Sequence, residues 1–386
     1  MVFNLVVEGW RFVPHSYSIV NQFQCLEFLK RKDRLNLFHR DLPYYNSSWQ
    51  RLEGIFSPED ETRLKEIPSP EQKSDVTFRI QYPYNLEPAS SDKTFVFATC
   101  EMSLVYPFML ENGRSLQENL SNNDEVVIIT PSQWSKRGFL NSGADPDRVV
   151  VIPHGFDPRI YHPVTEENRK ILRNNLGWDQ ESFVFLNIGS ILVCKGIDLL
   201  LKAFALVVES HPQAKLVLKG LDSLYSSQTS LEKLLEDLTF GELEKVLPRL
   251  LYIGESLSFG EIAQLYQGSD IYVSPYNSEG FNLPVLEALA CGLPAICTQG
   301  GSTEDFTNPD CALKIKSHLE NVEYFPQFED ALVLKPDLDH LVELMIKSIE
   351  DEHFRRQAKS AAVDFVTQGF TYEKVVDRLL LLFEDG

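Results

Sequence analysis

Two glutamates stand eight positions apart in the stretch SEGFNLPVLEALACG, which runs from residue 278 to residue 292. Glu279 lies before a glycine, an asparagine and a proline, and Glu287 lies after them. A pair of carboxylates can serve as the acid and base of a hydrolase, as metal ligands, as a clamp on sugar or ribose hydroxyls, or as ordinary surface charge. The elements that carry the two glutamates decide between these roles.

The residues around the two glutamates predict a junction between a strand and a helix. DIYVSPY precedes them and reads as a buried strand, while Pro284 suits a first helical turn and Gly292 ends the helical pattern. The first amides of a helix have no intrahelical partner, so they can bind a phosphate or a sugar oxygen. The amides expected in this position belong to Gly280, Phe281, Asn282 and Leu283.

The two glutamates differ in their surroundings. Glu287 is embedded in PVLEALACGLP, where a surface charge is awkward, and Glu279 ends the strand. The plain alternative is that Glu279 stabilises the helix dipole and Glu287 is a surface residue. We favour a functional role for both, facing one ligand from different sides.

Short apolar runs alternate with helical patterns over the whole chain of 386 residues, which is longer than a single hydrophobic core usually reaches. Continuous apolar strands bounded by turn residues indicate parallel sheets covered on both faces. The pattern therefore predicts an α/β protein with two doubly wound, Rossmann-like domains, whose ligands bind beyond the carboxyl ends of the strands. Strands are expected at residues 3–9, 35–40, 76–82, 94–99, 125–130, 148–153, 183–190, 214–220, 250–256, 270–276 and 294–300.

The division between the domains is expected near HGFDPRIYHPVTEEN, where Pro153, just before this stretch, and Pro158 and Pro163 within it interrupt the pattern. Residues 1–160 form the first domain and residues 161–368 the second. Residues 369–386 form a strongly apolar helix that can pack on either domain, including back on the first. Within the first domain, SQWSKRGFLNSG predicts a helix that Ser132 caps and Gly143 stops.

Composition excludes several classes of protein. A formal net charge of −20 argues against nucleic-acid binding. The apolar runs are too short for a signal peptide or an integral membrane segment, and the six cysteines and eight histidines show no metal-binding spacing. A cytoplasmic protein without a structural metal is predicted, either free or peripheral at a membrane. The basic cluster Lys30, Arg31, Lys32 and Arg34 is interpreted as a solvated helix end.

Three segments resemble a known family. SEGFNLPVLEALACGLPAICTQGG is similar to the E-x7-E signature of retaining GT-B glycosyltransferases, particularly the large family 4 (glycosyl transferases group 1). PSQWSKRGFLNSGADPDRVVVIPHGFDPRIYHP and FLNIGSILVCKGIDLLLKAFALV resemble that family's passage into, and opening of, its second domain. The segments cover residues 130 to about 305. The resemblance implies the GT-B architecture, with two domains facing a cleft.

The resemblance also implies roles for the donor side. Glu287 would bond the ribose hydroxyls of a nucleotide sugar and Glu279 the hydroxyls of the transferred sugar. Backbone amides of residues 280–282 would lie near the sugar and phosphate. Lys195, in the "KG" position, would meet the pyrophosphate and offset its charge as it leaves.

The donor side departs from the family at one point. Ser190 occupies the position where relatives carry an arginine. Lys219 either supplies the missing cation or is merely a solvated residue at the end of a strand. Residues 255–257, ending at Leu257, correspond to the backbone that meets the base, and they do not distinguish uracil from guanine.

The first domain matches the family more loosely. Relatives begin with a glycine-rich loop, of which Gly9 remains here. Ser16 is expected to cap a helix starting at Tyr17, with its amides facing the leaving phosphate. His15 is either a proton shuttle or an incidental loop histidine.

Two further residues are acceptor-side candidates. Glu101, in FATCEMSLVYP, corresponds to the residue facing the anomeric carbon in some relatives; alternatively, it caps a helix beginning there. Arg79 follows a strand and is a candidate for lining the acceptor cleft.

These features predict a retaining, metal-independent glycosyltransferase. The co-substrate is a UDP- or GDP-sugar, no other cofactor is required, and the hydroxyl acceptor is a saccharide, a lipid-linked glycan or a small molecule. An NAD-dependent enzyme is disfavoured because no GxGxxG follows the strands that begin at residues 2 and 183. The remaining rival is a catalytically weak or inactive nucleotide-sugar-binding member of a glycosylation complex, since the arginine is replaced at Ser190.

Overall fold

The chain divides into two compact units in a computed structural model that describes residues 2–123, 125–322 and 326–385. Unit 1 comprises Met1–Gly155, Asn321–Leu332 and Phe370–Gly386, and unit 2 comprises Phe156–Glu320 and Val333–Gly369. Residues 1 and 386, where the predicted first and last ranges begin and end, lie outside the described residues.

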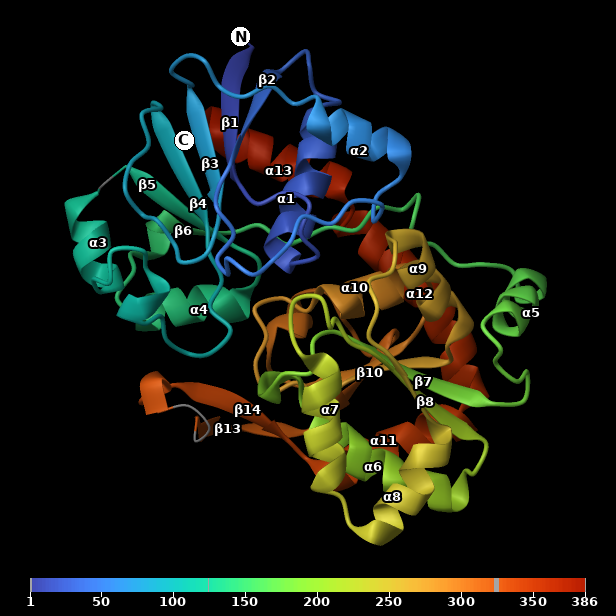
Figure 1. Cartoon of the computed structure of the whole chain (residues 1–386). Coiled ribbons are helices and arrows are strands. Elements are labelled where there is room, and N and C mark those ends of the chain that lie inside the picture. Colours follow the sequence, from blue (N-terminus) through green and yellow to red (C-terminus); the bar gives the residue numbers. More distant parts are fainter. Residues whose placement is uncertain (1, 124, 323–325, 386) are drawn as a thin grey trace. The chain divides into compact units, whose positions relative to one another are not determined.

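Unit 1 is built on a parallel sheet with the strand order β2-β1-β3-β4-β5-β6 (Figure 1). The central strands are buried along nearly their whole length, as their runs of Val, Ile and Phe predict. All six strands fall within the predicted ranges, to within a residue or two. They are β1 (Phe3–Gly9), β2 (Leu35–Asp41), β3 (Val76–Ile80), β4 (Lys93–Phe97), β5 (Val126–Thr130) and β6 (Val149–Val151).

The helices of unit 1 start at side-chain caps. Ser132 accepts a hydrogen bond from the amide of Ser135, and Gly143 follows the helix with φ of 89°, so both predicted boundary residues are confirmed. The α-helices are α1 (Ser16–Phe28), α2 (Pro58–Lys65), α3 (Leu116–Asn122), α4 (Gln133–Asn141) and α13 (Tyr372–Asp385). Short 3-10 turns are η1 (Pro107–Met109), η2 (Pro146–Arg148) and η6 (Pro326–Phe328).

The last described helix, α13, packs within unit 1 beside α1 (Figure 1). The buried ring of Phe383 lies 4.8 Å from that of Phe95 on β4 and 5.5 Å from that of Phe78 on β3, measured between ring centroids. Arg31 and Arg34, which lie between α1 and β2, form ion pairs with acidic residues of α13 at 3.0 and 2.8 Å. Half of the predicted solvated basic cluster therefore holds α13 in place.

Unit 2 is built on a second parallel sheet, with the order β12-β11-β10-β7-β8-β9. Five of these strands were predicted, and β12 was not. The strands are β7 (Phe183–Ile188), β8 (Ala214–Lys219), β9 (Leu250–Ile253), β10 (Ile271–Ser274), β11 (Ala295–Thr298) and β12 (Ala312–Ile315). Both sheets confirm the predicted fold class of two doubly wound, parallel α/β domains.

Apolar faces of several helices build the core of unit 2. Helix α6 contributes Leu200, Leu201 and Phe204, none of which is measurably exposed. The α-helices are α5 (Glu166–Asn175), α6 (Ile197–Ser210), α7 (Ser227–Glu236), α8 (Phe240–Val246), α9 (Phe259–Gly268), α10 (Leu283–Ala290), α11 (Leu338–Glu350) and α12 (Glu352–Gly369). The 3-10 turns are η3 (Val193–Lys195), η4 (Leu247–Arg249) and η5 (Ser302–Asp305).

The described division differs from the predicted one in two places. The first boundary falls at Gly155, five residues earlier than predicted. The segment Asn321–Leu332, predicted to lie in the second domain, packs in unit 1, where the amide of Leu332 bonds the hydroxyl of Ser103 at 2.7 Å. It connects two unpredicted strands that pair with each other, β13 (Ser317–Asn321) and β14 (Leu332–Pro336).

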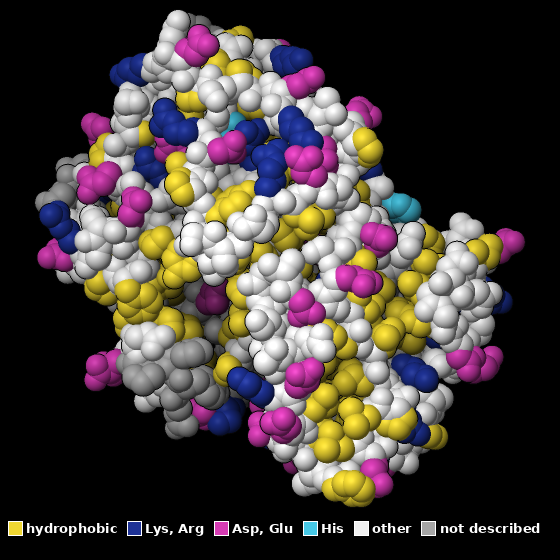
Figure 2. Space-filling view, in the orientation of Figure 1, with side chains coloured by type: hydrophobic (Ala, Val, Ile, Leu, Met, Phe, Trp, Pro, Cys, Tyr) yellow, Lys and Arg dark blue, Asp and Glu magenta, His cyan; other side chains and the backbone are white. Residues whose placement is uncertain are grey.

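Apolar side chains gather on the surface of unit 2 over α6, α7 and α8 (Figure 2). Leu206 of α6, Phe240 of α8 and Leu247, which follows α8, are exposed, and Phe240 is 76% exposed. Among the described residues, no helix combines the length and the apolar character needed to cross a membrane.

Candidate active site

Lys195 and Glu279 meet at the carboxyl edge of the sheet of unit 2. Lys195 ends η3, which follows β7, and Glu279 follows β10; these two strands are neighbours in the sheet. The ammonium group of Lys195 donates a hydrogen bond to Oε1 of Glu279. The Glu279 residue is only 7% exposed and the Lys195 side chain 26%, so the carboxylate of this ion pair is largely shielded from solvent.

Backbone contacts fix the two loops that carry this ion pair. The carbonyl of Cys194 accepts hydrogen bonds from the amides of Asn277 at 2.8 Å and Ser278 at 3.4 Å. Gly196 has φ of 67°, and a Cβ there would lie 2.0 Å from the carbonyl oxygen of Pro275. Only glycine fits this approach, which sets Lys195 beside the loop of Glu279.

The side chains of two residues at the start of α10 make contacts within the protein. Asn282 adopts a left-handed conformation, with φ of 78°, and its side-chain amide donates to the hydroxyl of Ser274 at 2.9 Å. The ring of Phe281 stacks on Phe306 at 4.6 Å. These contacts leave the backbone of the two residues as what they can present to a ligand, alongside Gly280 and the partly buried Leu283.

Glu287 lies inside α10 and is held by two tyrosines. The hydroxyl of Tyr266, on α9, donates to Oε2 of Glu287 at 2.9 Å, and the hydroxyl of Tyr161 also bonds this carboxyl group. Burial raises the pKa of Glu287 to about 7, although both hydroxyls oppose that rise. The Glu287 carboxyl group is thus divided between its protonated and ionised forms at neutral pH.

A buried tyrosine connects the three charged residues. Tyr272, on β10, exchanges hydrogen bonds with the backbone of Ile188 on β7, at 3.1 and 3.2 Å. Burial raises the pKa of its hydroxyl, with the carboxylates of Glu279 and Glu287 adding to the rise and Lys195 opposing it. All three charged groups therefore contribute to the pKa of one buried hydroxyl, and two of them, Lys195 and Glu279, are in direct contact.

Lys219 ends β8 next to the loop that carries Ser190. The amide of Gly189 donates to the carbonyl of Lys219 at 2.9 Å, and the ammonium group of Lys219 donates to the carbonyl of Gly220. The residue is 4% exposed, so of the two alternatives the solvated strand end is wrong. Burial lowers the pKa of Lys219 to about 8, against the opposing charges of Asp222 and Glu255.

Ser190 and Leu257 are the remaining donor-side candidates, and both are partly buried. Leu257 directly precedes Ser258, which caps α9 by accepting a hydrogen bond from the amide of Glu261. No described hydrogen bond links either residue to Lys195, Glu279 or Glu287.

The loop after β1 in unit 1 differs from the prediction. His15, and not Ser16, is the N-cap of α1: its Nδ1 accepts a hydrogen bond from the amide of Tyr17, and Ser16 is the first helical residue. The neutral ring therefore carries its proton on Nε2. Burial lowers the pKa of His15 to about 4, so the ring is neutral at physiological pH.

Gly9 lets the end of β1 pack closely against β3 and α1. A Cβ at Gly9 would lie 2.6 Å from the carbonyl oxygen of Ile80 on β3 and 2.8 Å from the side chain of Asn21 on α1. The glycine is therefore needed for close approach of strand and helix.

Arg79 is a buried structural residue. Its Nε donates to Oε2 of Glu8 at 2.9 Å, and its Nη1 donates to the carbonyls of Asn85 and Glu87 at 2.8 and 2.9 Å. With 7% exposure, the guanidinium group is committed to the interior of unit 1. The expectation that Arg79 lines an acceptor surface is wrong.

Glu101 is exposed, and no helix begins at this residue, so it is not a helix cap. Its carbonyl accepts a hydrogen bond from the indole of Trp134 at 2.8 Å. Burial raises the pKa values of Tyr82 and Tyr84, and the Glu101 carboxylate adds to both shifts. Its charge therefore acts on a group of aromatic residues at the carboxyl edge of the first sheet.

Sequence reasoning missed the tyrosines of both units. Tyr161, Tyr266 and Tyr272 read as apolar core positions, and their hydroxyl partners lie as many as 126 positions away in the chain. Periodicity reports that a residue is buried but does not report which polar groups it meets. The only feature of the sequence that pointed weakly to these hydroxyls was the number of tyrosines, 14.

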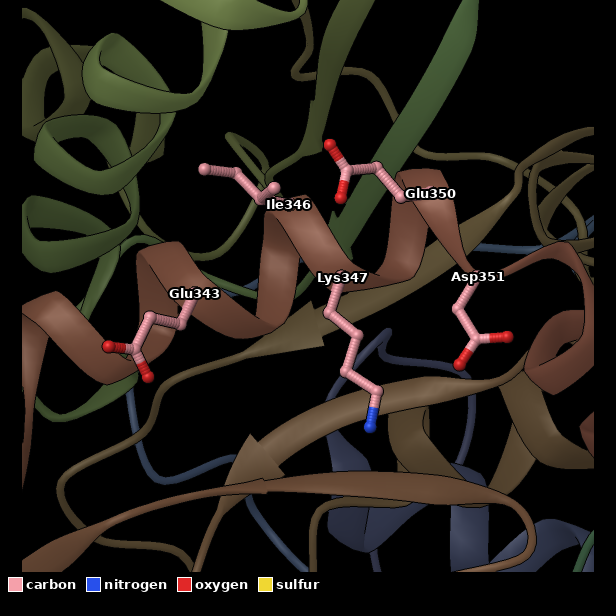
Figure 3. Close-up of a pocket in the computed structure, with 5 residues that line it drawn as sticks. All are labelled: Glu343, Ile346, Lys347, Glu350 and Asp351. Carbon is pink, nitrogen blue, oxygen red and sulfur yellow. The ribbon is translucent and has the colours of Figure 1, made fainter.

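A pocket in unit 2 has none of the predicted site residues. It lies along α11, where Ile346 and Glu350 extend from one side of the helix and Lys347 and Asp351 from the other (Figure 3). Glu343 completes its lining. Within the described ranges, His, Cys, Asp and Glu side chains form no group of three or more that could hold a metal ion.

Comparison with known proteins gives the family. The sequence profile of glycosyl transferases group 1 matches residues 168–364, just over half of the chain. The chain belongs to this family. The match includes Lys195, Lys219, Glu279 and Glu287.

Several curated relatives are similar to this chain. A D-inositol 3-phosphate glycosyltransferase of Corynebacterium aurimucosum is 27% identical over 213 residues, 54% of this chain and 49% of the relative. A GDP-mannose-dependent monoacylated alpha-(1-6)-phosphatidylinositol monomannoside mannosyltransferase of Corynebacterium glutamicum is 24% identical over 340 residues, 86% and 81% of the two chains. The match to the mannosylfructose-phosphate synthase of Agrobacterium fabrum, 28% identical, covers 46% and 38%. The chain thus spans about half the length of the first relative.

Solved structures show the same fold. HepE of Anabaena in complex with UDP-glucose matches with a TM-score of 0.71 and 16% identity, over 100% of both chains. WaaG, a glycosyltransferase of lipopolysaccharide biosynthesis, matches with a TM-score of 0.62 and 16% identity, over 99% of this chain and 100% of WaaG. The chain has the GT-B fold.

Proposed function

We propose that this chain is a retaining, family 4-type glycosyltransferase that moves a sugar from a UDP- or GDP-sugar to a hydroxyl acceptor without a metal ion. The observation that carries the proposal is the shielded ion pair of Lys195 and Glu279 at the carboxyl edge of the unit 2 sheet. A diphosphate draws Lys195 toward itself, and Glu279 is then released to accept hydrogen bonds from the hydroxyls of the transferred sugar.

The remaining donor contacts follow from the same edge of the sheet. Ionised Glu287 accepts hydrogen bonds from the ribose hydroxyls, and it also keeps its hydrogen bonds with the hydroxyls of the two tyrosines. The amides of residues 280–283 face the sugar and phosphate at the start of α10. Lys219 supplies a second cation near Ser190, and the backbone at residues 255–257 meets the base.

Two lines of similarity support a nucleotide-sugar donor. A curated relative is named as GDP-mannose-dependent, and HepE was crystallised with UDP-glucose. The two names differ in the base, so both nucleotides remain in the proposal.

The test is hydrolysis of nucleotide sugars by the full chain without an acceptor. We expect slow release of UDP or GDP that persists in EDTA, falls at least about tenfold in Lys195→Ala and Glu279→Ala, and is unchanged in Lys245→Ala. Lys245 is a matched control because it pairs with Glu209 on the exposed surface of unit 2. Hydrolysis that the variants leave intact would overturn the proposal.

The retaining mechanism needs a separate measurement. Proton NMR recorded before mutarotation should show that the released sugar keeps the anomeric configuration of the donor. The opposite anomer would exclude retention. Binding of a nucleotide sugar with no turnover, even with an acceptor panel, would favour the catalytically inactive member of a glycosylation complex.

A further inference from the structure

Six aromatic side chains in unit 1 form a closed circuit of contacts. His15 stacks on Tyr17 at 5.3 Å and lies 5.1 Å from Trp49, measured between ring centroids. Tyr45 lies 6.4 Å from Trp49 and 5.2 Å from Tyr82, which lies 5.4 Å from Tyr84. The hydroxyls of Tyr84 and Tyr17 close the circuit at 2.9 Å. We call these six residues the aromatic circuit.

The aromatic circuit is buried on one side and accessible on the other. Trp10 contacts His15, Tyr17 and Trp49 edge-on and is 1% exposed, so it closes the buried side. Tyr45 is 58% exposed, and Tyr82 is partly exposed. A ligand would therefore meet the rings of Tyr45 and Tyr82 first.

The position of the aromatic circuit fits a substrate site. Trp10 directly follows β1, Tyr82 follows β3 by two residues, and Tyr17 contacts Phe97 at the end of β4 at 5.3 Å. In a parallel sheet, ligands bind beyond the carboxyl ends of the strands. This edge of the first sheet is therefore where an acceptor would be bound if the proposed transfer takes place.

The electrostatics of this edge disfavour an anionic ligand. The three arginines nearest in sequence are all engaged in ion pairs: Arg11 with Asp41, Arg51 with Glu53, and Arg79 with Glu8. His15 is neutral, as is His154, whose pKa burial lowers to about 3 and whose ring lies 5.2 Å from Phe97.

The charge that does act on the aromatic circuit is negative. It comes from the exposed carboxylate of Glu101, which contributes to raising the tyrosine pKa values. Aromatic faces also carry negative potential. A phosphate group would be repelled here, whereas the apolar C–H face of a sugar ring can stack on Tyr45 or Tyr82 while its hydroxyls donate to Glu101 and bond the phenol hydroxyls.

We propose that Tyr45, Tyr82 and Glu101 bind an unphosphorylated, uncharged sugar ring as the acceptor. This inference rests on the proposed glycosyl transfer, and it specifies the acceptor class that the proposed function leaves open. It also separates this chain from relatives whose names include a phosphorylated small molecule, such as inositol 3-phosphate.

Saturation-transfer NMR on the full chain tests the inference. The neutral probes are the methyl glycosides of glucose, galactose, mannose and N-acetylglucosamine, and each is compared with the corresponding sugar 6-phosphate. Tetramethylammonium chloride is a third kind of probe, because aromatic rings can also bind a cation. At least one neutral glycoside should bind, and its 6-phosphate should bind at least about fivefold more weakly. Binding should fall by about fivefold or more in both Tyr45→Ala and Tyr82→Ala.

Phe240→Ala is the matched control, because it removes an exposed ring from unit 2. Tyr45→Ala keeps the test valid if Tyr82→Ala disturbs folding, since Tyr45 is largely exposed. The inference is overturned if only the 6-phosphates bind, if tetramethylammonium binds and no glycoside does, or if binding is the same in the tyrosine variants as in Phe240→Ala.

A thermal-shift measurement with UDP- and GDP-sugars separates this inference from the proposed function. Donor binding without glycoside binding overturns the inference alone. Glycoside binding without donor binding or turnover overturns the proposed transfer and leaves a sugar-binding site on unit 1.

Discussion

The hydroxyl of Tyr266 donates a hydrogen bond to Oε2 of Glu287 over 2.9 Å, from one helix to the next. This contact makes a helix-embedded carboxylate usable for binding, because the hydroxyl stabilises its charged form. Glu287 nevertheless keeps a pKa of about 7, since burial is the stronger effect. Small changes at Tyr266 should therefore move the charge of Glu287 within the physiological range.

Tyr266→Phe should make donor binding more sensitive to pH. Loss of the hydroxyl raises the pKa of Glu287 further, so less of the carboxylate is ionised at pH 7. We expect nucleotide-sugar affinity to fall at pH 7 and to recover by about pH 8.5. Isothermal titration across this range measures the midpoint. A uniform loss of affinity at every pH would contradict this account and indicate general disruption.

Glu287→Gln should remove a pH-dependent cost to stability. The unfolded carboxyl group ionises near 4.5 and the folded one near 7, so the unfolded state binds fewer protons between these values. Wild-type stability should therefore fall, relative to the variant, as pH rises through this window, by about 2–3 kcal/mol in total. Urea unfolding at pH 4.5, 6 and 8 measures the difference. A difference that does not change with pH would contradict the raised pKa.

Lys195→Ala should destabilise the chain by about 1–3 kcal/mol, because the largely buried carboxylate of Glu279 loses its cation. The double variant Lys195→Ala/Glu279→Gln removes that carboxylate charge as well. It should recover most of the stability without recovering nucleotide-sugar hydrolysis. Recovery of both would show that the ion pair serves folding alone.

Gly196→Ala should cost about 2 kcal/mol or more, since φ is 67° and the new Cβ would lie 2.0 Å from the carbonyl of Pro275. Gly241→Ala is the control: this glycine lies in α8 with no atom within 4 Å of a Cβ, and the change should add about 0.5–1 kcal/mol. Urea unfolding of both variants gives the comparison. Equal effects would mean that the loop of Lys195 is not held as described.

Lys219→Met should stabilise the chain at pH 7 by about 1–3 kcal/mol. The folded pKa is about 8 against 10.5 ordinarily, so the unfolded state binds more protons between these values and wild-type stability rises with pH there. The gain from the variant should shrink as pH approaches 10. If Lys219 also contacts the donor phosphates, the affinity for the donor falls in the same variant. Unchanged affinity would mean that Lys219 does not replace the arginine that relatives carry at the position of Ser190.

Most helices and strands were well predicted, because strands buried in a parallel sheet appear in the sequence as continuous apolar runs. FNLVVEG and FVFLNIGS alternate with helical segments and are found as β1 and β7. β13 carries no such run, because it is SHLEN and its side chains are mostly exposed, and it was missed for that physical reason. β14 is the short, mostly buried apolar run LVLKP, which was also missed.

Site residues were predicted less evenly. On the donor side, Lys195 and Glu279 follow neighbouring strands of the unit 2 sheet and form an ion pair. Arg79 also follows a strand, yet Glu8 on the adjacent strand engages it in the interior. Whether a charged residue faces a ligand or a buried partner depends on contacts distant in sequence, which spacing does not encode.

Helix α13 ties the order of synthesis to the order of folding. Its Phe383 fills the space between Phe78 and Phe95, yet it is made after the whole of unit 2. A ribosome that has finished the first 155 residues has therefore not yet supplied the cover for their sheet. During translation the nascent unit 1 exposes aromatic core to solvent, where it is open to chaperones and aggregation, until residues 370–385 emerge.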